Sequence, residues 1–193
     1  VLVQQLNLYK KIAEQLPYDS LIEITPLNGA GIVSYGVQLK AIQRVKHPLG
    51  DLICVADNQA VFLTYFRNNI LHLFILPSLV ACLMQHNGQL QREQMVSVIA
   101  SLYPYLQSEL FLPWDLAEIE GLVNQHIDAL IDAQLLTSHE ETIISPQPNT
   151  EAYAQLVILG EAVKETIERY YMTISLLTRR GSGSGNQKQL EDL

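Results

Sequence analysis

The sequence predicts a mainly α-helical protein: a helical bundle with two short β-hairpins, arranged as winged-helix-like modules. Three observations lead to this class. Apolar residues recur at helical spacing over several long segments, two shorter stretches flank turn residues as hairpins do, and each hairpin follows a group of helices. The 193 residues are 48% hydrophobic and only 17% charged, which is the profile of a folded chain with a substantial core.

The pattern divides the chain into four parts. We expect helices and a β-hairpin in residues 1–56, a second such module in 57–145, one long helix in 146–180, and a flexible linker with the start of a further helix in 181–193. The Gly-Ser run at 181–185 is typical of a flexible linker, natural or engineered. Because the chain opens and stops inside helical patterns, both ends look truncated.

The first part begins with apolar residues at helical spacing over Val1–Leu16, before a proline that cannot continue a helix. A weaker helix is expected over Leu27–Ala41, which contains three glycines. Ile42–Lys46 and Leu52–Val55 then flank a His-Pro-Leu-Gly turn, whose proline and glycine occupy the positions that a type I turn favours. These two stretches are the first predicted hairpin.

The second part contains the most apolar stretch of the chain, Val61–Met84. Asp57 is expected to cap a helix that starts near Asn58. Within the stretch, Ile70–Met84 has 15 residues, fewer than the about 20 needed to span a bilayer. We therefore expect a buried core helix there, with contact to a membrane or a partner domain as the alternative.

Three further helices follow. One is expected over Gln91–Leu110, with Pro104 bending or ending it. The next starts at a capping box, Asp115 with Glu118 three residues on, and precedes a hairpin between residues 135 and 144. Thr150 then opens a long helix of roughly 40 Å, whose expected apolar face is formed by Leu156, Leu159, Val163, Ile167, Tyr171, Ile174 and Leu177.

Net charge argues against nucleic acid as a partner. The chain carries a formal charge of −8, and the helix Asp115–Ala133, which would enter the major groove of a winged helix, has five acidic residues and no Lys or Arg. In the first module the equivalent helix has only Lys40. The same net charge argues against simple adsorption to an anionic lipid surface.

Cys54 and Cys82 have apolar neighbours and are expected to be buried free thiols in a reducing compartment.

No complete catalytic, cofactor-binding or metal-binding constellation is found, so no catalytic, cofactor or metal residue is predicted. His126-Ile127-Asp128 and His139-Glu140-Glu141 lack the register of a helical metal site, and a structural role is favoured for both. His47 and Asp51 could in principle act as a general base and the carboxylate that orients it. A hairpin turn accounts for both residues more simply, and we favour it. The Arg67-Asn68-Asn69 triplet can donate hydrogen bonds to a neighbouring segment or an anion, or simply form a solvated turn.

Several ordered blocks resemble bacterial membrane-bound glycerol-3-phosphate acyltransferases. The longest is Thr64–Ala81, and shorter blocks in the same order as in the family are His47–Asp51, Leu102–Leu106, Glu109–Asp115 and Arg169–Thr173. The resemblance covers nearly the whole chain and is weakest over Val1–Ala41. It implies a region that follows the catalytic domain of an enzyme transferring an acyl group from acyl-CoA or acyl-carrier protein to glycerol 3-phosphate, at the cytoplasmic side of the inner membrane.

The family's active site uses a histidine followed by an aspartate after four intervening residues, since the histidine takes the hydroxyl proton and the aspartate orients it. None of the five histidines here is followed by aspartate at that spacing, so this chain alone should be inactive. The resemblance implies packing against the catalytic domain of the same polypeptide. The expected contact residues are Tyr65, Arg67, Asn68, Asn69, His72, Pro77 and Ser78. The alternative is a free-standing winged-helix interaction module without enzymatic activity.

Overall fold

Helices dominate the computed structural model, which describes residues 1–193 except 17, 19–20, 49 and 181–193. Seven α-helices lie in the described part of the chain together with a two-stranded and a three-stranded antiparallel sheet. A mainly α fold with two small hairpins is therefore confirmed. The predicted linker and helix start at 181–193 fall outside the described residues.

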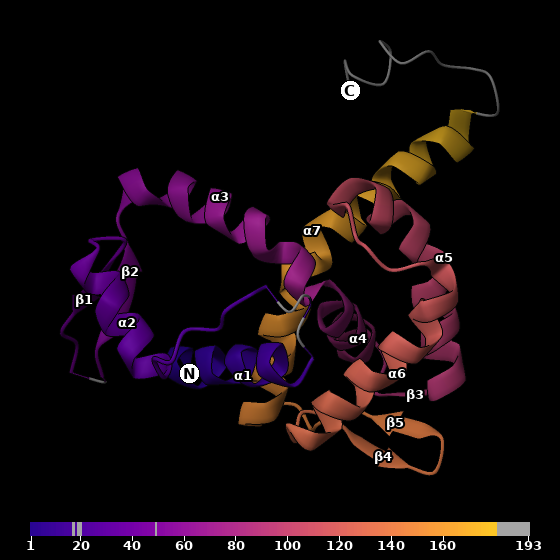
Figure 1. Cartoon of the computed structure of the whole chain (residues 1–193), viewed down its shortest axis with the longest axis horizontal. Helices are drawn as coiled ribbons and strands as arrows, with labels where there is room; N and C mark the ends of the chain where they lie inside the picture. Colours follow the sequence, from indigo (N-terminus) through magenta and orange to yellow (C-terminus); the bar gives the residue numbers. More distant parts are fainter. Residues whose placement is uncertain (17, 19–20, 49, 181–193) are drawn as a thin grey trace.

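The first elements form a lobe at one end of the molecule (Figure 1). Helix α1 spans Leu2–Gln15 and α2 spans Gly29–Gln38, shorter at both ends than predicted. The N–H of Gly29 donates to Asn7 Oδ1 at 2.7 Å, because α1 and α2 cross where glycine leaves room. Strands β1 (Ile42–Val45) and β2 (Leu52–Val55) form the predicted hairpin.

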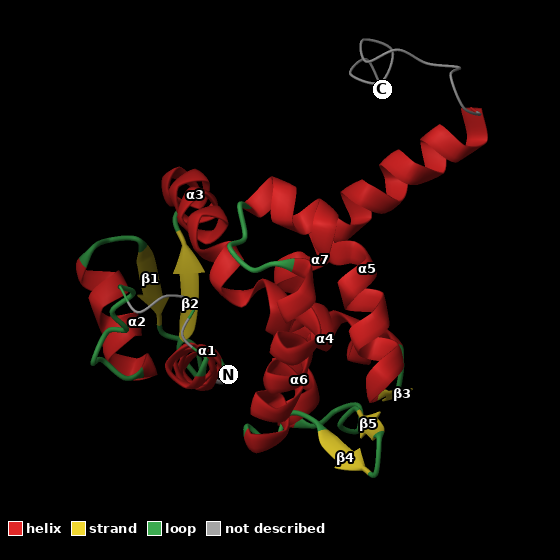
Figure 2. Ribbon diagram, turned by 45° about the vertical axis from the view of Figure 1, so that its right-hand side comes forward, coloured by secondary structure: helices red, strands yellow, loops and turns green. Residues whose placement is uncertain are grey.

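Helix α3, Ala60–Ile70, leaves this lobe and runs across to the rest of the chain, which it meets at its C-terminal end (Figures 1 and 2). It has no buried residue. The helix was expected to start near Asn58, but a 3₁₀ turn, η1, occupies Asp57–Gln59 and α3 begins at Ala60. The capping role expected of the Asp57 side chain lies outside the described part of the chain. A second 3₁₀ turn, η2 (Leu71–Phe74), joins α3 to α4.

The core surrounds α4, Ile75–His86, which packs chiefly against α7 (Glu151–Arg180) and α6 (Leu116–Asp132). Eight of its residues are buried, so the predicted buried core helix is present from Ile75 onward. The prediction fails for Ile70, which is 50% exposed at the end of α3. Gly160 of α7 permits the close approach, because a Cβ there would lie 3.1 Å from the Cys82 backbone. Leu8 and Ile12 of α1 belong to the same core.

Two helices and a small sheet complete this core. Helix α5 spans Arg92–Leu110 and contains Pro104 without ending there; α6 spans Leu116–Asp132 and starts with the predicted capping box. Strands β4 (Thr137–His139) and β5 (Thr142–Ile144) form the second hairpin. Sequence analysis missed β3 (Gln89–Gln91), which pairs with β5 and gives the sheet order β3-β5-β4. The winged-helix likeness of these elements stays a prediction.

Helix α7, Glu151–Arg180, is the predicted long helix. Thr150 Oγ1 accepts from the Tyr153 N–H at 3.2 Å, as expected of a helix start. Its first half packs on α4, while its second half projects from the body (Figures 1 and 2). The division of the chain into four parts stays a prediction, although α7 shares the core with the second module.

Candidate functional site

The residues expected to contact another domain fall into two groups. Tyr65, Arg67, Asn68 and Asn69 are exposed on α3, and Tyr65 is 62% exposed. Pro77 and Ser78, two further candidates, are buried in α4 inside the core of this chain, and Ser78 Oγ has no hydrogen-bond partner among the described residues. A surface built on this stretch therefore consists of its α3 portion.

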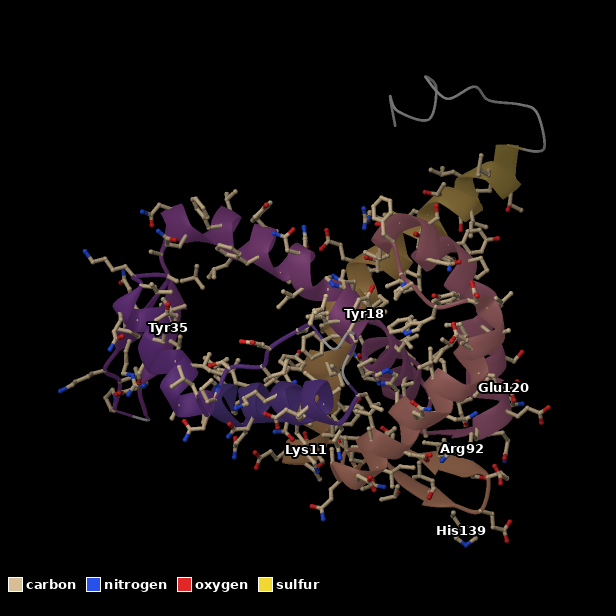
Figure 3. All side chains as sticks on the ribbon, in the orientation of Figure 1. Lys11, Tyr18, Tyr35, Arg92, Glu120 and His139 are labelled. Atoms are coloured by element: carbon tan, nitrogen blue, oxygen red, sulfur yellow. The ribbon has the colours of Figure 1, made fainter. Side chains whose placement is uncertain are left out.

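His72, the remaining candidate, is half-buried in η2. Its ring meets the ring of Tyr18 edge-on with centroids 4.8 Å apart, and Tyr18 in turn meets Trp114 at 5.0 Å. Figure 3 shows Tyr18 near the centre of the molecule, where the segment after α1 passes close to the start of α4. The imidazole of His72 thus takes part in aromatic packing within this chain.

A cavity of about 250 Å³ lies where α3, α5 and α7 meet. Arg67 of α3 donates from Nη2 to Glu165 Oε2 of α7 at 3.1 Å, and its Nε donates to Asn68 Oδ1 at 3.2 Å. Arg169 of α7 donates to Glu109 Oε1 of α5 at 2.9 Å. The lining residues are Arg67, Asn68, Leu71, Glu109, Leu110, Ala162, Glu165, Thr166 and Arg169.

Tyr170 extends this polar group on the α5 side. Its hydroxyl donates to the Glu109 carboxylate and lies 3.2 Å from the backbone carbonyl oxygen of Tyr105. Burial, followed by the hydrogen bond and negative charge of Glu109, raises the pKa of Tyr170 to about 12. The hydroxyl therefore stays protonated and acts as a hydrogen-bond donor at any physiological pH.

The cavity lies at the junction of three helices, and its charged side chains are paired with one another. Each of its two guanidinium groups is already paired with a carboxylate, so little positive charge is left for an anionic ligand. Both pairs are largely exposed and contribute little to stability on their own. Their effect is geometric, because they fix the end of α3 and the end of α5 against α7.

Two exposed apolar surfaces flank this junction. On α3 the exposed apolar residues are Val61, Phe62, Tyr65, Phe66 and Ile70, each at least 50% exposed. On the projecting part of α7 they are Tyr171, Met172, Ile174, Leu176 and Leu177. Tyr171, Ile174 and Leu177 belong to the predicted apolar face of this helix, and periodicity shows which residues share a face but not whether a neighbour covers it.

The remaining candidates lie apart from this junction. No group of three His, Cys, Asp or Glu side chains suited to a metal ion is present in the described ranges. His126 was expected on a helix flank but is only 6% exposed, within the core, while His139 is exposed at the end of β4 (Figure 3). Both cysteines are free thiols; Cys82 is half-buried, whereas Cys54 is exposed, contrary to prediction.

One helical run, Ala60–His86, is long and apolar enough to cross a membrane when judged by length and composition alone. Its most apolar 18-residue window has a mean hydropathy of 1.4 and is 44% buried. The buried part is α4, at the centre of the core. Because a core helix passes the same test, this run is weak support for a membrane span.

Comparison with known proteins identifies the family. The family model "Glycerol-3-phosphate acyltransferase C-terminal region" matches residues 1–193. The chain belongs to this family. It is 35% identical over 192 residues to the glycerol-3-phosphate acyltransferase of Pseudomonas paraeruginosa, and 34% identical over 192 residues to that of Pseudomonas aeruginosa strain LESB58. Each alignment covers all of this chain.

The chain spans 23% of the length of these curated relatives. A third relative, from Pseudomonas syringae pv. tomato, is 35% identical over 188 residues and gives the same 23% share. No solved structure matches this chain. The chain thus corresponds to the C-terminal region of these acyltransferases, and the absence of the His-x₄-Asp spacing agrees with a non-catalytic segment.

Proposed function

We propose that this chain is the non-catalytic C-terminal region of a glycerol-3-phosphate acyltransferase and packs against the catalytic region of the same polypeptide. That catalytic region would transfer an acyl group from acyl-CoA or acyl-carrier protein to glycerol 3-phosphate at the cytoplasmic side of the bacterial inner membrane. The family match and the 23% share of the relatives' length support this assignment. In this proposal the chain packs against the catalytic region and supplies no side chain that takes part in the reaction.

The observation that carries the proposal is the apolar stripe of α7. Leu156, Leu159 and Val163 lie on the side of α7 that enters the core, and each is fully buried. Ile174 follows Val163 by eleven residues, about three helical turns, and therefore lies on the same side. Yet Ile174 is 54% exposed and Leu177 is 48% exposed. The stripe thus continues beyond the elements of this chain that cover it.

The exposed residues of α3 form a second uncovered apolar surface. α3 exposes Tyr65 and Phe66, whose rings lie 5.8 Å apart, and the ion pair of Arg67 with Glu165 attaches its end to α7. Large contiguous apolar patches on a protein surface mark interaction sites. We call the exposed residues of α3 and of residues 171–177 of α7 the α3–α7 surface, and place the contact with the catalytic region there.

The test replaces Ile174 and Leu177 together by serine in the full-length polypeptide. If this face is buried against the catalytic region, each change removes about 1–2 kcal/mol of apolar burial. We therefore expect a lower thermal stability of the catalytic region and a severalfold loss of acyl transfer. A matched control is Val98→Ser with Ile158→Ser, because these residues are 42% and 39% exposed elsewhere on the chain.

A second measurement separates a folding defect from a lost contact. The 193-residue chain and the catalytic region, expressed separately, should associate, and the double variant should weaken this association on the order of tenfold or more while its far-ultraviolet circular dichroism stays unchanged. Equal association by the double variant and the control would contradict the proposed surface. A catalytic region that behaves identically without the chain would favour the free-standing interaction module.

A further inference from the structure

Phe111 combines a strained backbone with an exposed aromatic ring. It follows the last residue of α5 and has φ 54°, in the left-handed region. Its side chain is 87% exposed, and no aromatic side chain in the described part of the chain is more exposed. A left-handed residue at the end of a helix is usually glycine or asparagine, because the Cβ of other residues crowds a carbonyl oxygen. A bulky residue in this conformation is an outlier of the kind found at functional sites.

The other left-handed residues follow the usual pattern for a protein surface. Lys40, Gln134, Glu140 and Asn149 are the remaining non-glycine residues with positive φ among those that the structure describes, and all four are polar. Gln134 is the closest match to Phe111, because it comes just after the end of α6, has φ 61° and is exposed. Folding of this chain alone gives no reason for a phenylalanine at the fifth such position.

The backbone after Phe111 is held firmly. Leu112 is 4% exposed and belongs to the core, and its N–H donates to the Gln107 carbonyl oxygen at 3.2 Å. The Trp114 carbonyl oxygen accepts from the Tyr103 hydroxyl at 2.6 Å and from Gln107 Nε2 at 2.8 Å. The left-handed turn therefore directs Leu112 into the core and leaves the ring of Phe111 outside. A ring on a fixed backbone loses little conformational entropy when a partner binds it.

The end of α5, which carries Phe111, lies beside the uncovered part of α7 (Figures 1 and 2). Leu110, the preceding residue, lines the cavity at the junction with α7. The rings of Tyr105 on α5 and Tyr170 on α7 lie 6.2 Å apart. Tyr171 follows at once, is 72% exposed and is the first α7 residue of the α3–α7 surface. The exposed ring of Phe111 is thus placed next to this surface.

We propose that Phe111 is an anchor residue that inserts its ring into an apolar pocket of the catalytic region. This inference rests on the proposed packing of the chain against that region, and it names the residue that contributes most to the contact. Aromatic side chains that enter a pocket of the partner commonly dominate the affinity of an interface. The chain spans only 23% of the length of its relatives, so a large part of such a polypeptide is available to cover the ring.

The charges near Phe111 favour an apolar partner over an anionic one. An acidic protein or an anionic membrane would need unpaired cations beside the ring. No Lys or Arg occurs in the sequence between Arg92 and Lys164, and Arg169, which reaches the end of α5, is paired with Glu109 at 2.9 Å. An apolar pocket needs no such cations. The catalytic region is therefore preferred as the occupant, and the test must distinguish it from a lipid or a second copy of the chain.

The first test compares Phe111→Gly with Gln134→Gly in the 193-residue chain. Each variant relieves a left-handed residue after a helix, and each removes a side chain that is exposed. We therefore expect both to raise the unfolding temperature by about 2–4 °C. The end of α6 lies on the opposite side of the body from the end of α5, so Gln134→Gly is a matched control for the release of strain (Figures 1 and 2).

The second measurement is association with the separately expressed catalytic region. Phe111→Gly should weaken the association on the order of tenfold or more, and should lower acyl transfer by the full-length polypeptide. Gln134→Gly should leave the association within about twofold of the unmodified chain. Phe111→Leu keeps a large apolar side chain and should retain most of the affinity. A variant that stabilises the chain and yet weakens the contact is expected of an anchor residue, and not of a residue that serves the fold.

Photo-crosslinking in the full-length polypeptide identifies what covers the ring. Benzoylphenylalanine in place of Phe111 should crosslink to a peptide of the catalytic region in the same polypeptide, whereas the same group in place of Gln134 should not. Crosslinks to lipid, or between two polypeptides, would overturn the proposal.

The association data separate this inference from the packing role. Equal association by Phe111→Gly and Gln134→Gly, while the Ile174 and Leu177 double variant binds more weakly, would reject the anchor and leave the packing role standing. Failure of the unmodified regions to associate would overturn both.

Discussion

The buried imidazole of His126 makes the stability of this chain sensitive to mild acid. The side chain is 6% exposed, and its Nδ1 atom has no hydrogen-bond partner among the described residues. Burial lowers the pKa of His126 from 6.5 to about 4. Protonation in the folded state would place a charge, and a second N–H donor, in the core without compensation.

The direction and size of the effect follow from linkage. Because the folded pKa lies below the unfolded value, the unfolded state binds the proton first, and stability is lost as the pH falls from about 6.5 towards 4. The full difference corresponds to about 3 kcal/mol. At pH 5 the imidazole is almost fully protonated in the unfolded chain and mostly neutral in the folded one, so about 2 kcal/mol is already lost relative to pH 7.5.

The assay is urea unfolding at pH 7.5 and pH 5, for the unmodified chain and for His126→Leu. Leucine has a similar volume and does not titrate, so the variant reports the pH effect of all other groups. We expect the unmodified chain to lose about 2 kcal/mol more than the variant between the two pH values. Equal losses, or an imidazole that titrates above pH 6 in the folded chain by NMR, would refute the reasoning.

Two further predictions concern helix packing and capping. Gly160→Ala should destabilise the chain by about 1–2 kcal/mol, because the new Cβ meets the Cys82 backbone at 3.1 Å, whereas Gly121→Ala, with open space around it, should stabilise by about 0.5–1 kcal/mol. Thermal unfolding of the two variants measures both effects. Equal shifts in the unfolding temperature would show that α4 moves to accommodate the new Cβ, and would contradict this reasoning. Asp115→Ala removes the capping box and should cost about 1 kcal/mol in urea unfolding, while Glu120→Ala on the same helix should cost much less.

The helices were predictable where sequence signals act locally. The capping box at Asp115 and the Thr150 helix start depend on residues within three positions of each other, and both appear in the structure. The hairpin at β1 and β2 likewise follows from its own turn residues. The apolar spacing also predicted a helix on both sides of Pro104, and α5 contains this proline. The proline itself did not indicate whether the helix would bend or end there.

Features that depend on distant partners were not predictable in this way. Strand β3 has three residues and exists because β5, more than fifty positions later, offers it a free edge. The cavity residues Glu109 and Glu165 gave no local signal, since their arginine partners lie on other helices. Cys54 appeared buried from its apolar neighbours, yet the face of β2 on which it lies has no covering element.

The pattern of exposure favours a region of a larger polypeptide over a free-standing module. The core around α4 is closed by residues of this chain, so the fold has its own source of apolar burial. An independent module would carry polar residues outside that core, whereas here α3 is apolar without a buried residue and the α7 stripe extends past its cover. A closed core combined with open apolar helices is expected of a unit that folds locally and is then covered by another domain, as proposed above for the catalytic region.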